Sequence, residues 1–268
     1  MSQYHMPKIM AILNINNDSF YKNSRTMLLD EALSKAEQHR QNGAEWLDIG
    51  AESTRPNATP ISYEQELERL APILAAIKKN IDIKISVDTR HSETMQYAID
   101  NGALMINDTH ALSAHNALET IAKSNVLVTL MHMQNSPSNM QDNPTYENVV
   151  NEVIDFLQAK IDLCTKNNIP TERIIIDPGF GFGKTLEHNW ELLRNLDKIK
   201  SLNVPILIGI SRKSFIGQTL GIDSPSKRGV ASAIIHSFAC FKGVDIIRTH
   251  DVIWTKQAIT LAKQFDMG

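Results

Sequence analysis

Three residues at the ends of apolar runs carry side chains suited to binding a flat, polar ring. Asp88 follows I-K-I-S-V, Asn107 follows A-L-M-I, and Asp177 follows R-I-I-I. A carboxylate can accept two parallel hydrogen bonds from neighbouring N–H groups, and an amide can both donate and accept. The three residues are therefore candidates to bind the edge of a nitrogen heterocycle.

A second set of residues at similar positions is cationic or carries hydroxyl groups. It consists of Thr54, Arg55, Ser211, Arg212, Lys213, Ser214, Arg248 and His250. Guanidinium and ammonium groups together with hydroxyl donors suit a phosphate or a diphosphate. The two sets predict a ligand in which a heterocycle carries a diphosphate. A single polar residue after a strand is as often a helix cap as a ligand contact, but all eight apolar runs of the chain end on polar residues.

The glycine-rich segment I-D-P-G-F-G-F-G-K-T at 176–185 has the look of a nucleotide-binding loop. A phosphate-binding loop has the spacing G-x-x-x-x-G-K-[ST], so that successive backbone N–H groups surround a phosphate. Counting back five residues from Gly183 reaches Pro178, which has no N–H. The dinucleotide pattern G-x-G-x-x-G fails as well, because Lys184 takes the place of its third glycine. We therefore expect Asp177 to end a buried strand that opens into a loop with another purpose.

Eight short apolar runs, rich in Ile, Val and Leu without strict alternation, are typical of parallel strands buried on both faces. They cover 8–15, 45–50, 83–88, 103–108, 126–131, 173–177, 205–210 and 245–249. Helical patterns lie at 28–42, 63–80, 92–101, 115–124, 146–168, 188–200, 226–242 and 252–264. Eight strand–helix units in about 250 residues predict an α/β fold, a single-domain (β/α)8 TIM barrel over residues 1–268. Such a barrel gathers the polar strand ends on one face; a doubly wound open sheet is the alternative.

Three polar residues near these positions have structural interpretations. We expect Asp108 to cap the following helix and His132, in M-H-M-Q, to be a packed and hydrogen-bonded histidine. For Lys184, exposure after the glycine loop and a role in the site are equally compatible with the sequence. No pair of Cys or His residues has metal-ligand spacing, which argues against zinc. Magnesium bound with a diphosphate fits better, because Mg²⁺ needs few protein ligands beside phosphate oxygens.

The composition predicts a soluble globular protein and argues against several kinds of partner. The chain has 268 residues, a hydrophobic content of 42% and a net charge of −3. It lacks the basic block expected of a nucleic-acid-binding protein. Its apolar runs are too short to span a bilayer, and its N-terminus does not have the pattern of a signal peptide. Two isolated cysteines, Cys164 and Cys240, are expected to be buried small apolar residues of a cytoplasmic protein.

Eight segments of the chain resemble motifs of the dihydropteroate synthase family, the folate-pathway enzymes that sulfonamides block. They are L-N-I-N-N-D-S-F (13–20), I-G-A-E-S-T-R-P (49–56), S-V-D-T (86–89), I-N-D (106–108), M-H-M-Q (131–134), D-P-G-F-G-F-G-K-T (177–185), G-I-S-R-K-S-F-I-G (209–217) and I-I-R-T-H-D-V (246–252). The resemblance runs from about residue 8 to the end of the chain. It implies a (β/α)8 barrel, a homodimer and the use of Mg²⁺.

The resemblance also implies a reaction. The family condenses 6-hydroxymethyl-7,8-dihydropterin diphosphate with p-aminobenzoate to give 7,8-dihydropteroate and diphosphate. Diphosphate would leave from C9 of the pterin, and the arylamine would attack that carbon without a covalent enzyme intermediate. Cations would stabilise the leaving group, and loop closure would keep water away.

The motifs assign roles to individual residues of this chain. The pterin would be bound by Asp88, Asn107, Asp177, Phe182 and Lys213. Arg248 would stack on or flank the pterin ring and, with His250, hold the diphosphate. Thr249 would also bind substrate, and Asn14 would contact the Mg²⁺–diphosphate unit. A mobile loop would contain Thr54, Arg55 and Pro56, and the p-aminobenzoate pocket would contain Phe20, Pro56 and Ser214. The residues implied to act in catalysis are Asp18, Arg55, Lys213 and His250.

The first loop departs from the family pattern, which is close to N-V-T-P-D-S-F-S-D-G-G. Here the segment reads N-I-N-N-D-S-F-Y-K-N-S, so that Thr-Pro becomes Asn16-Asn17 and an acidic position becomes Lys22. Loss of Pro and Gly changes the turns available to the loop. A catalytically weak, pterin-binding paralogue is therefore an alternative, although the intact E-S-T-R-P and S-R-K-S segments argue against it.

Two further functions would use parts of the same set of residues. A folate-binding methyltransferase domain would share the Asp and Asn contacts to a pterin, but it would not need the cationic residues. A barrel lyase would use Lys213 as a Schiff-base nucleophile. Nothing else in the sequence predicts a carbonyl substrate for such a lyase.

Overall fold

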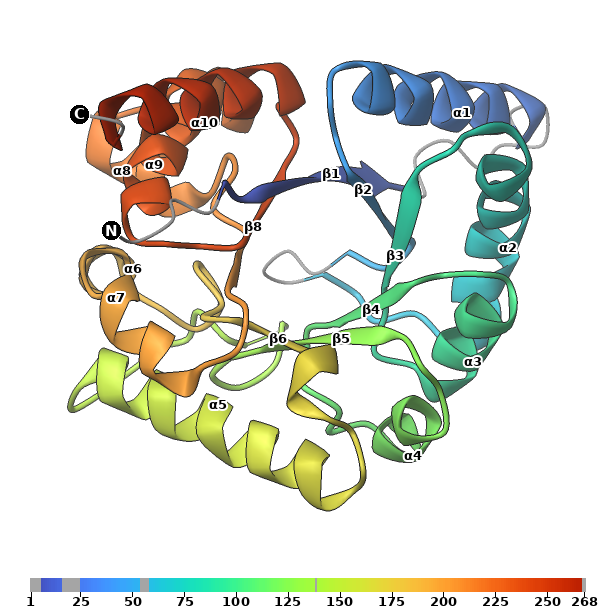
Figure 1. Ribbon diagram of the computed structural model, residues 1–268, viewed down its shortest axis with the longest axis horizontal. Helices are drawn as coiled ribbons and strands as arrows, with labels where there is room; N and C mark the ends of the chain where they lie inside the picture. The colour runs from blue at the N-terminus through green and yellow to red at the C-terminus, as the bar shows by residue number, and fades with distance from the viewer. Residues whose placement is uncertain (1–5, 16–24, 54–57, 138, 267–268) are drawn as a thin grey trace.

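The computed structural model describes residues 6–15, 25–53, 58–137 and 139–266. A ring of parallel strands is surrounded by helices (Figure 1). The strands are β1 Lys8–Asn14, β2 Trp46–Gly50, β3 Lys84–Asp88, β4 Met105–Asp108, β5 Leu127–Met131, β6 Ile174–Asp177, β7 Leu207–Ile208 and β8 Ile246–Thr249. The α-helices are α1 Arg25–Gln41, α2 Tyr63–Asn80, α3 Ser92–Asp100, α4 Ala117–Ala122, α5 Val149–Lys166, α6 Leu186–Arg194, α7 Leu196–Ile199, α8 Ser214–Leu220, α9 Gly229–Phe241 and α10 Val252–Asp266. Three short 3₁₀ helices are η2 Thr171–Arg173, η3 Lys200–Leu202 and η4 Pro225–Arg228.

The sheet closes into a barrel, so the prediction of a (β/α)8 fold is confirmed. Parallel pairing follows the order β6-β5-β4-β3-β2-β1-β8-β7, and the gap between β6 and β7 is bridged by Ile176 and Ile206. The N–H of Ile176 donates to the carbonyl oxygen of Pro205 at 2.9 Å, whereas Pro205 has no N–H to return a bond. Pairing at this seam is short, but it excludes the open, doubly wound sheet.

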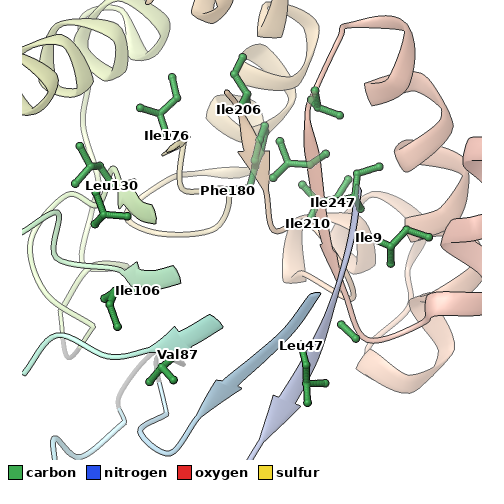
Figure 2. Packing of buried hydrophobic residues seen from close by; sticks show 14 of the residues in the cluster. Ile9, Leu47, Val87, Ile106, Leu130, Ile176, Phe180, Ile206, Ile210 and Ile247 are labelled. Carbon is green, nitrogen blue, oxygen red and sulfur yellow. The ribbon is translucent and has the colours of Figure 1, made fainter. Parts of the chain in front are cut away.

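Side chains of each strand alternate between the outer and inner faces of the ring. Leu47, Val87, Ile106, Leu130 and Ile247 belong to the main core, which they share with apolar residues of the surrounding helices (Figure 2). The inner side has its own buried cluster, which we call the inner apolar layer. It consists of Met10, Trp46, Met105, Ile175, Leu207 and Ile246. The strands are thus covered on both faces, as parallel strands usually are.

Helix α2 shows how local sequence signals form the outer layer. Its N-cap residue Ser62 accepts a hydrogen bond from Gln65 N–H at 3.4 Å, and the N–H of Ser62 donates to Gln65 Oε1 at 3.2 Å. This capping box satisfies two donors at the start of the helix. The buried residues Leu70, Leu74 and Ile77 recur at three- and four-residue spacing. They form the apolar face with which α2 packs against β2.

The helices after β6 and β7 differ from the prediction. The helix expected at 188–200 is divided at Asn195, where φ of −109° and ψ of 23° interrupt the helical backbone between α6 and α7. Helix α8 was not predicted, because its seven residues are too few to show a helical period. It begins directly after Lys213, so the S-R-K-S segment lies at the start of a helix.

The structure bears on two expectations, one about the cysteines and one about membrane-spanning helices. Cys164 on α5 and Cys240 on α9 are buried and do not form a disulfide, which confirms their predicted role as small core residues. Within the described part of the chain, no helix combines the length and the apolar character needed to cross a membrane.

Candidate active site

The inner apolar layer is followed by a polar layer nearer the carboxyl ends of the strands. Its members Asp48, Asn107, Asp177 and Arg248 each come two residues after a member of the apolar layer, in the order Trp46, Met105, Ile175 and Ile246. Because strand side chains repeat every two residues, the four polar side chains share the inner face with that layer. Asp88 joins them, since it pairs in register with Asn107. The expectation that polar strand ends meet on one face is confirmed.

Arg248 binds two carboxylates within the polar layer. Its Nε donates to Oδ2 of Asp48 at 2.6 Å, and its Nη2 donates to Oδ2 of Asp88 at 2.8 Å. The fully buried Asp48 also accepts hydrogen bonds from Ser86 Oγ at 2.6 Å and from Asn107 Nδ2 at 3.0 Å. Asp48 therefore orients Asn107 and Arg248. The resemblance assigned Arg248 to the pterin ring and to the diphosphate, and the structure places its guanidinium beside the carboxylates of Asp48 and Asp88.

Asp48 is a residue of the site to which sequence reasoning assigned no role, although it is one of the polar residues near the end of the second apolar run. It lies inside strand β2 and not at its end, between the fully buried residues Leu47 and Ile49. Ligand contacts in a barrel usually come from strand ends, and Asp48 lies two residues before the end of β2. The available signal was a lone acid in the apolar run W-L-D-I-G. A buried carboxylate in such a run requires a partner, because an unpaired buried charge is costly.

Burial shifts the pKa values of this region toward the uncharged forms. It raises the pKa of Asp88 to about 7, although Arg248 acts in the opposite direction. It also raises the pKa of Asp177, against the hydrogen bond from Gly179 and the charge of Lys213. For Lys213, burial lowers the pKa to about 8, and Asp177 opposes the shift. Clustered shifts of this kind are typical of a ligand-binding or catalytic site.

The glycine-rich loop after β6 is organised by its own residues and not around a phosphate. Gly179 has a φ of 71°, and a Cβ at this position would lie 1.8 Å from the carbonyl oxygen of His132. The N–H of Gly179 donates to Oδ1 of Asp177 at 2.7 Å. Thr185 caps helix α6 by accepting the N–H of His188 at 3.2 Å. These groups serve the fold, which agrees with the prediction that the segment is not a nucleotide loop.

Lys184 is buried and holds this loop together. Its Nζ donates to the carbonyl oxygens of Gly179 at 2.9 Å and Phe182 at 3.1 Å, and it lies 2.9 Å from Nδ1 of His132. Burial lowers the pKa of Lys184 to about 7 and that of His132 to about 3. The His132 ring packs edge-on against Phe156, with 4.9 Å between the centroids. The expectation of a packed histidine is confirmed, and Lys184 is not the exposed residue that the sequence left open.

Asp108 also has a structural role, but not the one expected. Its carboxylate accepts the backbone N–H groups of His110 and Leu112, both at 2.7 Å. Helix α4 begins later, with Asn116 as its N-cap. The prediction that Asp108 caps the following helix is therefore wrong, because a separate turn comes between β4 and α4.

Lys213 reaches the glycine-rich loop from the end of β7. Its Nζ lies 3.8 Å from the centroid of the Phe182 ring, which is a cation–π contact. A Cβ at Gly181 would lie 3.1 Å from Cδ of Lys213, so glycine leaves room for the lysine stem. The two residues that the resemblance placed beside the pterin therefore contact each other.

His250 lies among three cations just after β8. Its Nδ1 is 3.1 Å from Oγ of Ser211. Burial lowers the pKa of His250 to about 4, and the charges of Arg248, Arg212 and Lys213 act in the same direction. At neutral pH the imidazole is therefore uncharged, and it can donate one hydrogen bond to an anion that the cations attract.

Arg212 and Thr249 interact mainly with other residues of the protein. Nε of Arg212 donates to Oδ2 of Asp251 at 2.8 Å, and its Nη2 donates to the other oxygen of that carboxylate. The Thr249 side chain is fully buried, and its hydroxyl lies between those of Thr255 and Ser211. In this structure, neither the hydroxyl nor the methyl of Thr249 is on the surface that a substrate would meet.

Several predicted residues lie at the edge of the site or beyond it. Asn14 is exposed at the end of β1, level in register with Gly50 and Asp88, and Ser214 is exposed at the start of α8. Outside the described residues lie Asn16, Asn17, Asp18, Phe20, Lys22, Thr54, Arg55 and Pro56. Among the residues that the structure describes, no group of three or more His, Cys, Asp or Glu side chains is placed to hold a metal ion.

Known proteins are similar to this chain in both sequence and fold. The family model described as pterin binding enzyme matches residues 10–250. The dihydropteroate synthase of Haemophilus influenzae is 44% identical over 255 residues, which cover 95% of this chain and 92% of that protein.

Two solved structures are similar over nearly their whole length. The Yersinia pestis dihydropteroate synthase, in complex with a sulfonamide drug, has a TM-score of 0.93 and 38% identity, covering 98% of this chain and 95% of its own. The Xanthomonas albilineans dihydropteroate synthase with 4-aminobenzoic acid has a TM-score of 0.91 and 38% identity, covering 97% and 93%. The chain therefore belongs to the family of pterin binding enzymes that includes the dihydropteroate synthases.

Proposed function

We propose that the chain is a transferase that condenses 6-hydroxymethyl-7,8-dihydropterin diphosphate with p-aminobenzoate to give 7,8-dihydropteroate and diphosphate. The observation that carries the proposal is the buried polar layer beside two hydrogen-bond donors at one end of the barrel. The layer presents Asp88, Asn107 and Asp177, and the donors are the ammonium group of Lys213 and the neutral imidazole of His250. The similarity to dihydropteroate synthases, one of them solved with 4-aminobenzoic acid, supports the same reaction.

The polar layer has the chemistry to bind the pterin edge. Ionised Asp88 and Asp177 are acceptors for the adjacent N–H groups of an aminopyrimidinone ring. Asn107 donates to Asp48 through Nδ2, which leaves its carbonyl oxygen free to accept. Arg248 donates a hydrogen bond to Asp88 and holds its carboxylate in place. Because these groups are buried, the ligand would supply the hydrogen bonds that water would otherwise make to them.

Bond breaking and bond forming would both occur at C9. The C9–O bond breaks with its electron pair leaving on the diphosphate, and the electron-rich dihydropterin delocalises the positive charge. Lys213 and Arg248 offset the charge of the leaving group, and neutral His250 donates a hydrogen bond to it. The nitrogen lone pair of p-aminobenzoate then forms the new C9–N bond, and the nitrogen loses a proton to solvent. No covalent bond to the protein forms.

Mg²⁺ fits the residues at the end of β1. The exposed amide oxygen of Asn14 is the kind of ligand that Mg²⁺ accepts, and phosphate oxygens would supply further ligands. When bound, the ion would neutralise charge on the diphosphate. Asn14 would contact the Mg²⁺–diphosphate unit, and its register with Asp88 across β2 supports a place at the same end of the barrel.

An apolar face on α9 and α10 supports a homodimer. Its exposed side chains are Val230, Ile234, Phe238, Phe241, Ile253, Trp254, Leu261 and Phe265. The α9 residues recur every three or four positions, and helices α9 and α10 pack side by side (Figure 1). Large exposed apolar patches usually mark an interface, and a second copy of the chain is the commonest partner. A cytoplasmic location agrees with two buried cysteines that do not form a disulfide.

The other functions have less support. A weak paralogue is not favoured, because the relatives of this chain are named dihydropteroate synthases. A methyltransferase would not require Lys213 and His250 as donors to a diphosphate. For a lyase, the lowered pKa of Lys213 would suit a nucleophile, but its Nζ faces the Phe182 ring in the pterin region. Borohydride in the presence of a carbonyl substrate should therefore trap no adduct.

An assay of both products tests the proposal directly. Purified protein is mixed with 6-hydroxymethyl-7,8-dihydropterin diphosphate, p-aminobenzoate and Mg²⁺, and dihydropteroate and diphosphate are measured together. We expect equal amounts of both, dependent on p-aminobenzoate and inhibited by a sulfonamide that competes with it. Pterin binding without condensation would contradict the proposal and point to the altered first loop.

A further inference from the structure

A chain of buried hydrogen bonds leads from helix α9 to His250. It begins at His236, whose Nδ1 lies 3.1 Å from Oγ1 of Thr255 on α10. Oγ1 of Thr255 is 3.0 Å from Oγ1 of Thr249, which in turn is 3.4 Å from Oγ of Ser211. Oγ of Ser211 is 3.1 Å from Nδ1 of His250. Three hydroxyl groups thus connect two imidazole rings, and His236, Thr255 and Thr249 are each 0% exposed, so water does not reach this part of the chain.

The hydrogens available at Ser211 restrict the protonation of His250. Oγ of Ser211 accepts the backbone N–H of His250 at 3.2 Å and is also the partner of Thr249. A hydroxyl has two acceptor lone pairs and one hydrogen. When Thr249 donates to Ser211, both lone pairs are used, and the hydrogen of Ser211 is directed to Nδ1 of His250. Nδ1 is then an acceptor, and the neutral ring carries its hydrogen on Nε2.

The far end of the chain decides in which direction the hydroxyl groups donate. In one direction, His236 donates from Nδ1 and each hydroxyl donates toward His250. In the other, each hydroxyl donates toward His236, whose own hydrogen then lies on Nε2. That nitrogen is buried and has no hydrogen-bond partner among the described residues. A buried N–H group without an acceptor is rarer in proteins than a buried acceptor without a donor. The direction in which His236 carries its hydrogen on Nδ1 is therefore favoured.

We infer that His236, Thr255, Thr249 and Ser211 are positioning residues that hold the hydrogen of neutral His250 on Nε2. The inference rests on the proposed function, in which His250 lies beside the departing diphosphate. With Nδ1 bonded to Ser211, the Nε2–H group is the donor that the ring offers to a ligand. The opposite tautomer would present a lone pair to the anion and would repel it.

The charges around His250 give the tautomer a consequence for the reaction. Burial, together with the charges of Arg248, Arg212 and Lys213, lowers the pKa of His250 to about 4, against the effect of Asp251. The ring therefore stays neutral at neutral pH, and its tautomer decides whether it can donate to the diphosphate. A donor fixed in advance needs no reorganisation when negative charge develops on the leaving oxygen.

NMR of the full-length protein with ¹⁵N-labelled histidine tests the inference without any substrate. Spectra that correlate ring nitrogens with ring hydrogens show which nitrogen is protonated, and a His250→Asn variant identifies the signals of His250. We expect Nε2–H in the unmodified protein, and a hydrogen on Nδ1 would overturn the inference. Because no turnover is measured, failure of the proposed reaction would be seen separately, in the product assay.

Substitutions along the chain test whether it controls the tautomer. Thr249→Val removes the hydroxyl that donates to Ser211, so both tautomers of His250 should appear, whereas Thr249→Ser should restore one. Thr260→Val is a matched control, because its exposed hydroxyl donates to the carbonyl oxygen of Lys256 on the same helix as Thr255. A His250 spectrum in Thr249→Val that is identical to that of the Thr260→Val control would overturn the role of the chain.

Steady-state kinetics supply a second readout. In Ser211→Ala, kcat should fall roughly tenfold, the kinetic equivalent of one hydrogen bond to a charged group. The KM for p-aminobenzoate should stay unchanged, because His250 is assigned to the diphosphate and not to the arylamine. A rise in that KM with unchanged kcat would contradict the inference, since it would show that Ser211 acts on the other substrate.

Discussion

The lower and upper parts of the barrel interior come from the same strands but have opposite chemistry. The lower part is the inner apolar layer, in which Trp46, Met105, Ile175 and Ile246 pack together. The upper part is the polar layer, reached by moving two residues, or about 7 Å, along each strand. There Arg248 joins carboxylates that would each be costly to bury alone.

The comparison separates stability from function along one axis of the fold. Apolar contacts in the lower part stabilise the barrel without any ligand. In the upper part, burial raises the pKa of Asp88 and lowers that of Lys213, so the charged forms are held at a cost. A ligand with matching donors and a diphosphate would offset that cost. Substitutions in the two parts should therefore change different measurements.

Asp48→Asn should have the largest effect on stability. It removes the carboxylate that binds Arg248 Nε, Asn107 and Ser86, and we expect the free energy of unfolding to fall by about 4 kcal/mol. Urea denaturation provides the measurement. The matched control is Asp197→Asn, whose exposed partner Lys242 lies at 2.8 Å, with an expected loss below about 1 kcal/mol. Equal losses would show that the polar layer behaves like an ordinary surface.

Lys213→Ala should have the largest effect on catalysis. Loss of the cation beside Phe182 is expected to lower kcat by about 10²- to 10³-fold, because the developing charge on diphosphate loses a fixed partner. The product assay measures it, with the exposed Lys227→Ala on η4 as the control. Normal turnover in Lys213→Ala would remove this residue from the mechanism. Stability should not fall, because a buried ammonium group is removed.

Ile175→Ala tests the lower part on the strand that also carries Asp177. The cavity left in the inner apolar layer should lower the free energy of unfolding by about 3 kcal/mol. The effect on kcat should be within about twofold, provided that the polar layer above keeps its geometry. Urea denaturation and the product assay are compared on the same preparation. A loss of activity without a loss of stability would reverse the proposed division.

Asp177→Asn is the matching change two residues further along β6. Replacing the acceptor carboxylate by an amide should weaken binding of 6-hydroxymethylpterin by about tenfold or more, the range of a hydrogen bond to a charged group. Isothermal titration calorimetry gives the affinity. The free energy of unfolding should not fall, since burial already disfavours the ionised Asp177. Unchanged affinity would mean that the pterin does not contact this residue.

The smallest expected effect is a pH dependence of pterin binding. Burial raises the pKa of Asp88 to about 7, and a pterin with N–H donors binds the ionised form. Protonation therefore competes with binding, so affinity should fall as pH falls through 7, by roughly fivefold between pH 7 and pH 6. Calorimetry at several pH values measures it. The dependence should disappear in Asp88→Asn, and its persistence would assign it to another group such as Asp177.

Much of the barrel could be predicted because its strands are local features. All eight apolar runs contain a strand, and the residues at their ends, such as Asp88, Asn107 and Asp177, could be named from position alone. Helix α8 and the separation of α7 from α6 at Asn195 could not be predicted, since neither α8 nor α7 has enough residues to show a helical period. Asp108 was assigned to the wrong structure because a turn and a helix cap use the same residue types.

The sequence by itself determined the order of strands and helices and the residue types gathered at one end of the barrel. Only the tertiary structure decided which of those residues pair. Arg248 lies 200 positions from Asp48, yet they share a hydrogen bond, and Lys184 is buried against His132, 52 positions away. Such partners, and the pKa shifts that follow from them, depend on burial and distance. The separation of two residues along the chain predicts neither their burial nor the distance between them, because closing the barrel brings distant strands together.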